Sequence, residues 1–184
     1  KEIKEEIEAF STALLNMKLE NKKVAVIGSN RYEWCVTYLA ATTGNMVIVP
    51  LDKALPTGEI ENLIKISKAD AVVYENKFAE VFNKIKEENT SNLTTYINMD
   101  LDNQKDGILS FKELVEEGKE LIKNGNDSYN KIKMDNEKMS ILLFTSGTTA
   151  MAKGVMLSQK NICSNVMAMA KMSKMYPDDV ILSF

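Results

Sequence analysis

Apolar positions recur with two different spacings along the chain. Short continuous apolar runs, such as Val24–Ile27 and Ile141–Phe144, are typical of strands that are covered on both faces. Between these runs, apolar residues return at the spacing of one helix face. The runs predict strands at residues 24–28, 46–52, 71–74, 94–98, 141–144, 155–157 and 180–184. The periodic segments predict helices at residues 2–19, about 30–43, 57–64, 78–85, 111–123 and 159–174.

Strands that alternate with helices of this length predict crossover connections and therefore a mostly parallel sheet. The expected fold class is α/β, with helices on both faces of the sheet. In open sheets of this kind, ligands bind beyond the carboxyl ends of the strands. The segment that follows Phe144 is therefore where we expect a ligand.

Polar residues and a glycine mark the expected helix ends. The expected N-caps are Ser29 or Asn30, Thr57, Ser110 and Ser158. Glu113 follows Ser110 at the spacing of a capping box. Gly44 stands where the second helix is expected to stop.

The segment after the predicted strand Ile141–Phe144 is rich in hydroxyls and glycine. It reads Thr145-Ser146-Gly147-Thr148-Thr149-Ala150-Met151-Ala152-Lys153-Gly154-Val155. The glycines can take positive φ and leave room for a ligand near the backbone. The hydroxyls and the Lys153 ammonium are donors, and consecutive backbone N–H groups in such a loop form an anion-binding concavity. The natural ligand of this set is a polyphosphate.

Spacing excludes two common phosphate motifs. The loop lacks both the Walker A spacing G-x-x-x-x-G-K-[ST] and the dinucleotide fingerprint G-x-G-x-x-G. A plain turn that happens to be rich in these residues stays open as an alternative.

The loop resembles the phosphate loop of the acyl-adenylate-forming superfamily, through Thr145–Thr149 and Lys153–Val155. Asn30–Trp34, Gly44 and Val49–Asp52 resemble the N-terminal part of long-chain-type acyl-CoA synthetases. The segment Leu157–Ile162 does so too. The likeness is strongest over residues 24–52 and 141–166 and weakest over residues 84–137.

The resemblance implies that the full-length protein is an AMP-forming acid–thiol ligase. Such enzymes use ATP to join a carboxylic acid, here a fatty acid, to AMP with release of pyrophosphate, and then transfer the acyl group to CoA. The implied phosphate-binding residues are Thr145, Ser146, Gly147, Thr148, Thr149, Lys153 and Gly154, with Lys153 also assigned a catalytic role. Mg²⁺ would bridge the phosphates, held mostly by phosphate and water rather than by protein ligands.

The resemblance also places other parts of the active site beyond Phe184, including the adenine and ribose pockets and the small C-terminal domain. The sequence begins with Lys1 inside a helical pattern, so we expect residues 1–184 to be a partial N-terminal domain. On its own, such a chain is expected to be inactive, to bind ATP weakly and to self-associate. Two positions depart from the family pattern, since Ala150 stands where glycine is usual and Gln159 where histidine is common.

Two other functions stay open at this point. An amino-acid-activating adenylation domain of a peptide synthetase shares the loop. A non-catalytic phosphate-binding module would also keep it.

A second motif lies where the likeness is weak. Asp102, Gln104, Asp106, Gly107 and Glu113 occupy positions of an EF-hand calcium loop. Gln104 replaces the usual Asp or Asn, the preceding segment is predicted as a strand, and the capping role explains Glu113 otherwise. We therefore expect no calcium site here.

Methionines recur on and just after the expected helix 159–174, at positions 167, 169, 172 and 175. An exposed methionine-rich surface is one interpretation. Their helical spacing favours the other, in which they pack in the core.

Composition narrows the class of partner. The 184 residues have a formal net charge of −3 and a pI near 5.2, which argues against nucleic acid. No apolar run is long enough for a transmembrane helix, and no secretory signal is present. The absence of histidine and the two distant cysteines, Cys35 and Cys163, argue against zinc and favour the reducing cytoplasm. The expected partners are the small-molecule substrates ATP, carboxylic acid and CoA.

Overall fold

A computed structural model of the chain describes residues 2–145, 152–173, 176 and 178–180. The strands are β1 (Lys23–Ile27), β2 (Val47–Pro50), β3 (Ala71–Tyr74), β4 (Thr95–Asn98), β5 (Leu109–Ser110), β6 (Met139–Thr145) and β7 (Lys153–Ser158). The α-helices are α1 (Glu2–Asn16), α2 (Tyr32–Thr43), α3 (Thr57–Ser67), α4 (Ala79–Glu88), α5 (Phe111–Lys123) and α6 (Gln159–Met172). Two short 3₁₀ helices are η1 (Asn76–Phe78) and η2 (Tyr129–Lys131).

The strands form one sheet in the order β5-β4-β3-β1-β2-β6-β7. Every neighbouring pair is parallel except β6 and β7, which form an antiparallel hairpin. The part β2-β1-β3-β4-β5 has the strand order of flavodoxin-like doubly wound folds, whose switch point lies between β1 and β3. The α/β fold class and the mostly parallel sheet are therefore confirmed.

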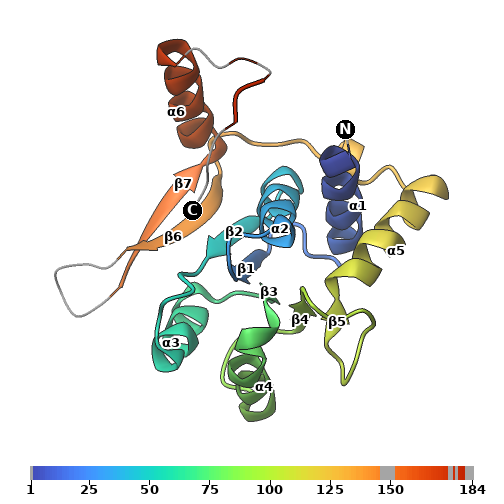
Figure 1. The fold of residues 1–184 in the computed structure, drawn as a ribbon, viewed down its shortest axis with the longest axis vertical. Helices are drawn as coiled ribbons and strands as arrows, with labels where there is room; N and C mark the ends of the chain where they lie inside the picture. The colour runs from blue at the N-terminus through green and yellow to red at the C-terminus, as the bar shows by residue number, and fades with distance from the viewer. Residues whose placement is uncertain (1, 146–151, 174–175, 177, 181–184) are drawn as a thin grey trace.

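Helices cover both faces of the sheet (Figure 1), as the sequence predicts. Helices α1, α2 and α5 enclose one core, which takes Val24 and Val26 from β1. Helices α3 and α4 enclose the other, which takes Ala25 and Ile27. Successive residues of β1 thus point into opposite cores, and both are apolar because both faces of the sheet are covered.

Two glycines let helices approach closely on the first face. A Cβ on Gly118 of α5 would lie 1.9 Å from the carbonyl oxygen of Ala9 in α1. A Cβ on Gly44 would lie 2.3 Å from Ser11 Oγ, so Gly44 serves packing as well as ending α2. Its φ of −88° is open to any residue, and its lack of a side chain is what the fold uses.

The expected helix caps are confirmed in part. Ser158 and Asn161 form a full capping box at α6. At α5, Ser110 Oγ accepts from the Glu113 N–H at 3.2 Å, but the Glu113 carboxylate accepts from the Gln104 N–H, so only half of the expected capping box is present. The expectations for the starts of α2 and α3 are wrong. Arg31 precedes α2 without a side-chain cap bond, and Pro56, with φ already at −60°, precedes α3.

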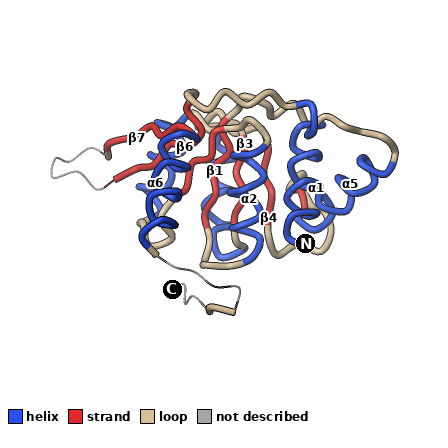
Figure 2. The backbone as a smooth tube through the Cα atoms, turned by 90° about the horizontal axis from the view of Figure 1, so that it is seen from above, coloured by secondary structure: helices blue, strands red, loops and turns tan. Residues whose placement is uncertain are grey.

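The β6–β7 hairpin projects from the body of the molecule (Figures 1 and 2), and α6 lies apart from the other helices (Figure 1). No described residue of α6 is buried, and Met167, Met169 and Met172 are 61%, 57% and 88% exposed. The expected core packing of these methionines is therefore wrong for this chain, because no other element covers their side of the helix among the described residues. The predicted strand at 180–184 lies almost wholly outside the described residues.

Among the helices that the structure describes, none is both long enough and apolar enough to cross a membrane.

Candidate functional site

Strand β6 carries the chain from the sheet to the predicted phosphate loop. It joins β2 through a single residue pair, Ile48 with Ile141. Ile141 is buried, but Leu143 is already 38% exposed and Thr145 is exposed. The expected strand is confirmed, whereas its burial on both faces holds only at its beginning, because the later part of β6 has left the shared sheet.

Thr145 and Lys153 face each other at the open end of the hairpin. They are paired in the antiparallel register, and Phe144 pairs with Gly154 next to them. Because β6 runs parallel to β2, Thr145 lies at the carboxyl edge of the sheet. The expected placement of these two residues at that edge is confirmed.

Lys153 is exposed, and within the part of the chain that the structure describes its ammonium has no ion pair or side-chain hydrogen bond. Opposite it, Thr145 presents an exposed hydroxyl. An unpaired cation beside a hydroxyl donor fits the oxygens of a phosphate group. The two described ends of the loop therefore have the donor chemistry that a triphosphate needs.

Gly154 serves the hairpin in a different way from the one expected. Its φ is not positive, and it lies in the extended backbone of β7. A Cβ there would lie 3.1 Å from Leu142 Cδ1 and 3.5 Å from Phe144 Cε1. The expected positive φ is wrong for Gly154, which instead leaves space for two apolar side chains of β6.

The remaining predicted site residues, Ser146, Gly147, Thr148 and Thr149, lie outside the described residues. The same holds for Ala150, whose departure from the family pattern stays an expectation. The structure thus places the first residue of the loop, Thr145, and the returning pair Lys153 and Gly154.

A second set of polar residues lies at the carboxyl ends of β1, β3 and β4, and the sequence analysis did not predict it. We call this set the paired edge. Its members are Ser29, Arg31, Glu33, Glu75, Asn76, Lys77 and Asp100.

Arg31 is the centre of the paired edge. Its guanidinium donates to Glu33 at 2.6 Å and to Asp100 at 2.5 Å. Asp100 in turn accepts from the backbone N–H of Asn76 at 2.7 Å. These contacts join the loops that follow β1, β3 and β4.

Glu75 makes the second connection. Its carboxylate accepts from the Ser29 N–H at 2.7 Å, and Lys77 Nζ lies 3.2 Å from the same carboxylate. Lys77 also donates to Ser29 Oγ at 3.1 Å. In the sequence, the only sign of this set is a polar residue after each strand. Polar residues also follow strands in ordinary turns, so this sign does not predict that the loops bond to one another.

The pairing shifts the titration of these groups. The hydrogen bond from Arg31 lowers the pKa of Glu33, and the bond to Glu33 raises the pKa of Arg31. Burial alone would raise the pKa of Glu75, but the hydrogen bonds from Ser29 and Lys77 outweigh it, so that pKa lies below its ordinary value. The charged groups of the paired edge therefore interact with one another and stabilise the loops that carry them.

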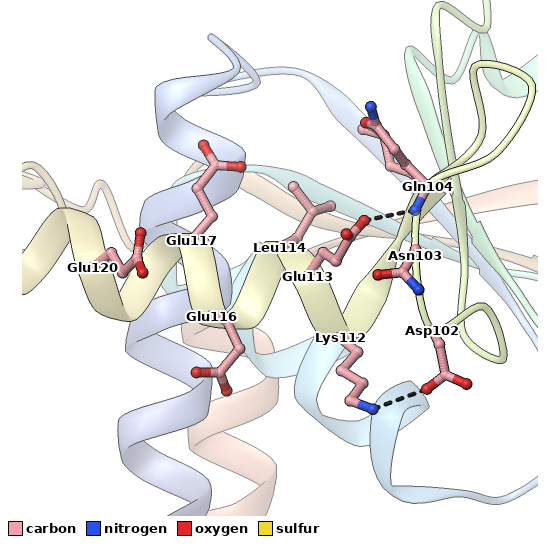
Figure 3. A pocket seen from close by; sticks show the side chains of 10 residues that line it. Asp102, Asn103, Gln104, Lys112, Glu113, Leu114, Glu116, Glu117 and Glu120 are labelled. Atoms are coloured by element: carbon pink, nitrogen blue, oxygen red, sulfur yellow. Dashed lines mark hydrogen bonds and ion pairs between the residues drawn. The ribbon is translucent and has the colours of Figure 1, made fainter.

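An open cleft of about 830 Å³ lies along α5, on the side of the molecule away from the hairpin (Figures 1 and 3). Three of the five EF-hand-like residues, Asp102, Gln104 and Glu113, line it. Lys112 pairs with Asp102 at 2.8 Å, and the Glu113 carboxylate accepts from the Gln104 N–H at 2.6 Å. The strand expected before this loop is present as β4, and β5 pairs with it, so the two helices of an EF-hand do not flank the loop.

The carboxylates of Asp102, Glu113 and Glu116 thus bond to groups of the same loop and helix, whereas Glu117 accepts from Asn16 of α1 at 3.4 Å. Among the described residues, no group of three or more His, Cys, Asp or Glu is arranged to hold a metal ion.

Known proteins resemble the chain over its whole length. A family model described as AMP-binding enzyme matches residues 1–184. The chain is 29% identical over 202 residues to long-chain-fatty-acid–CoA ligase 5 of Rattus norvegicus, an alignment that covers 100% of the chain and 29% of that protein. It is 27% identical over 171 residues to a CoA ligase of Gibberella moniliformis, covering 93% of the chain and 26% of that protein.

Solved structures share the fold. A long-chain-fatty-acid-CoA ligase from Archaeoglobus fulgidus superposes with a TM-score of 0.76 at 19% identity, over 92% of this chain and 31% of that one. ATP-bound MatB from Rhodopseudomonas palustris superposes with a TM-score of 0.73 at 23% identity, over 96% of this chain and 33% of that one. The chain therefore spans about a third or less of the length of the relatives it matches.

Proposed function

The chain belongs to the family of AMP-binding enzymes, and from this premise we propose that the protein containing it is an ATP-dependent acyl-CoA synthetase. It activates a carboxylic acid as acyl-AMP, releases pyrophosphate and transfers the acyl group to CoA. The observation that carries the proposal is the hairpin, which holds Thr145 and Lys153 opposite each other at the carboxyl edge of the sheet.

In the proposed reaction, the acid's carboxylate oxygen attacks the α-phosphorus of ATP and pyrophosphate departs with the bonding electron pair. Negative charge grows on the departing group as the bond breaks. Lys153 supplies a positive charge and Thr145 a hydroxyl donor that are already in place, so neither has to be reorganised as the charge develops. Residues 146–149 are assigned to the same phosphates from the family motif.

Magnesium, ATP and CoA are proposed as the cofactor and co-substrates. The hairpin contributes donors and a cation, and its described residues include no carboxylate. Mg²⁺ prefers oxygen ligands and keeps several waters. The chemistry of the hairpin therefore fits a metal that the phosphates carry into the site.

A fatty acid is the proposed acyl substrate. Support comes from curated relatives named as long-chain and medium-chain ligases, which include long-chain-fatty-acid–CoA ligase 6 and medium-chain acyl-CoA ligase ACSF2 of Homo sapiens. We propose that the protein acts in the cytoplasm, an assignment supported by the two cysteines, Cys35 and Cys163, which are both free. Fractionation of cells that express the tagged protein tests the location.

The test of the proposed function is acid-dependent exchange of labelled pyrophosphate into ATP, followed by a CoA thioester assay. The longer protein that contains residues 1–184 is assayed with fatty acids of several lengths and with the common amino acids. Exchange driven by a fatty acid, with thioester formed on CoA, supports the proposal. Exchange driven by amino acids alone points to a peptide-synthetase adenylation domain, and the absence of exchange with every acid points to a non-catalytic phosphate-binding module.

The 184-residue chain on its own is a separate case. Because it spans less than a third of the curated relatives' lengths, we propose that it has no ligase activity and binds ATP weakly. Met156 on β7 and Val166 on α6 are 70% and 59% exposed, and the methionines of α6 are exposed as well. Exposed apolar side chains in this number favour self-association. Calorimetry with MgATP and light scattering of the wild type and of Met156→Gln test both points. Micromolar binding or a strictly monomeric wild type would contradict them.

A further inference from the structure

The phosphate-loop hairpin is held to the sheet at its root. One residue pair, Ile48 with Ile141, joins β6 to β2, and β7 lies at the outer edge of the described sheet. The root is the point where β7 ends at Ser158 and α6 begins at Gln159. Contacts at this point, together with the packing of Leu142, Phe144 and Ala152 against the core of α3 and α4, decide where the hairpin stands relative to the sheet.

Gln159 makes a hydrogen bond across the root. Its side-chain Nε2 donates to the carbonyl oxygen of Thr42 at 3.0 Å, between residues 117 positions apart in the sequence. Thr42 lies in the last turn of α2, where carbonyl groups have no partner within the helix. The bond therefore gives this carbonyl a donor from outside its helix and ties the first residue of α6 to α2.

The end of helix α2 that accepts this bond is fixed in place by its packing in the core. Ala40 and Ala41, which immediately precede Thr42, are fully buried in the core that α2 shares with the sheet. The Gln159 side chain is half-buried, and with Ser140 and Met46 it lines a cavity of only about 10 Å³. The backbone N–H of Lys160 adds a second tie, at 3.0 Å from the Asn136 carbonyl oxygen.

We propose that Gln159 is a positioning residue for the phosphate-binding hairpin. By holding the junction of β7 and α6 against α2, its amide fixes where β7 presents Lys153 at the carboxyl edge of the sheet. Gln159 does not itself touch the phosphates. This inference rests on the proposed function of the hairpin, and it adds a residue to which neither the loop motif nor the relatives' names assign a role.

Three variants separate the hydrogen bond from size and charge. Gln159→Glu keeps the shape of the side chain but, when ionised, has no donor for the Thr42 carbonyl. Gln159→His restores an N–H donor on a side chain of similar reach. Gln104→Glu is the matched control, since Gln104 is the other glutamine of the chain, is exposed, and makes no side-chain hydrogen bond within the described residues.

Hydrogen exchange of the 184-residue chain reads the position of the hairpin directly. In Gln159→Glu, we expect peptides that cover residues 153–165 to exchange about tenfold faster, whereas peptides of β1 and β3 keep their wild-type rates. Gln159→His and Gln104→Glu should behave like the wild type. Unchanged exchange in Gln159→Glu would overturn the proposal, and so would a uniform acceleration that includes β1 and β3.

Kinetics of the longer protein provide the second test. In pyrophosphate exchange, Gln159→Glu is expected to lower kcat about tenfold while KM for MgATP changes less than threefold, because a displaced Lys153 stabilises less of the transition-state charge, and Gln159→His is expected to recover most of the loss. A raised KM with unchanged kcat would overturn the positioning role. A wild-type protein without exchange activity would instead refute the proposed function, and hydrogen exchange would still decide whether Gln159 holds the hairpin.

Discussion

The carboxyl edge of the sheet carries two sets of polar residues, and they differ in whether the fold uses their charges. At the ends of β1, β3 and β4, the charges of the paired edge are bonded to one another, with Arg31 and Glu75 as the two centres. At the end of β6, Lys153 is exposed and without an ion pair among the described residues. The charges of the paired edge hold three loops together, whereas the charge of Lys153 is available to a ligand.

The difference shows why strand order alone does not locate this site. In a flavodoxin-like sheet, the ligand is expected at the switch point between β1 and β3. Here the loops after those two strands are joined directly, by the bond from the Ser29 N–H to Glu75. Within the described chain, the unpaired Lys153 lies instead on the hairpin that the chain adds beyond β2.

The largest expected effect is on the hairpin side. In the longer protein, Lys153→Ala should slow acid-dependent pyrophosphate exchange by about 10²–10³-fold, because one preorganised donor to transition-state charge is worth roughly 2.7–4 kcal/mol. Lys171→Ala, an exposed lysine on α6, is the control and should leave the rate unchanged. An unaltered rate in Lys153→Ala would remove this residue from the site.

The next effect is on stability and belongs to the paired edge. Arg31→Met removes the bonds to Glu33 and Asp100, and we expect the free energy of unfolding to fall by about 1–3 kcal/mol. Arg31→Lys keeps the charge but not the forked geometry and should give an intermediate loss. Urea unfolding of the 184-residue chain measures all three proteins, and equal midpoints would show that the pairing does not stabilise the fold.

A smaller effect is expected on the pH dependence of stability, and it also belongs to the paired edge. The pKa values of Glu33 and Glu75 lie below the ordinary value of 4.5, so both groups stabilise the fold above that pH. As the pH falls through their folded pKa values, the carboxylates are protonated and the contribution is lost. Glu75→Gln should therefore flatten the acid side of the unfolding profile measured by urea titration between about pH 3 and 6, and a profile as steep as the wild type's would contradict this cause.

The smallest effect is expected where a cation is paired but fully open to water. Lys160 pairs with Glu137 at the root of the hairpin, and the two side chains are 61% and 69% exposed. Such a pair gains little because water screens it. Lys160→Met should leave the unfolding midpoint and the exchange rate unchanged, and a large loss in either would mean that the exposed pair supports the hairpin.

Much of the fold followed from the sequence because local rules decide it. The bounds of α5 agree with the predicted 111–123, since the periodic apolar residues and the Ser110 cap coincide there. The start of α3 did not follow, because Thr57 is a good cap by type while Pro56 already has the required backbone. Strand β5, only two residues long, gave no pattern to detect.

The site followed from the sequence in outline. The loop motif placed Thr145 and Lys153 at the correct edge, because a parallel strand must deliver its next residue there. The paired edge and the bond from Gln159 to Thr42 did not follow, since both join residues far apart in the chain. The exposure of α6 did not follow either, because helical spacing indicates which face is apolar but not what covers it.

The most direct measurement compares the chemical reactivity of the lysines at this edge. The longer protein is treated with a limiting amine-acylating reagent, with and without MgATP, and modification of each lysine is quantified by mass spectrometry. We predict that MgATP protects Lys153 in a saturable way and leaves Lys77, which is bonded to Glu75 and Ser29, unchanged. Unchanged labelling of Lys153 on addition of MgATP, or protection of Lys77 in its place, would contradict the assignment of the phosphate site to the hairpin.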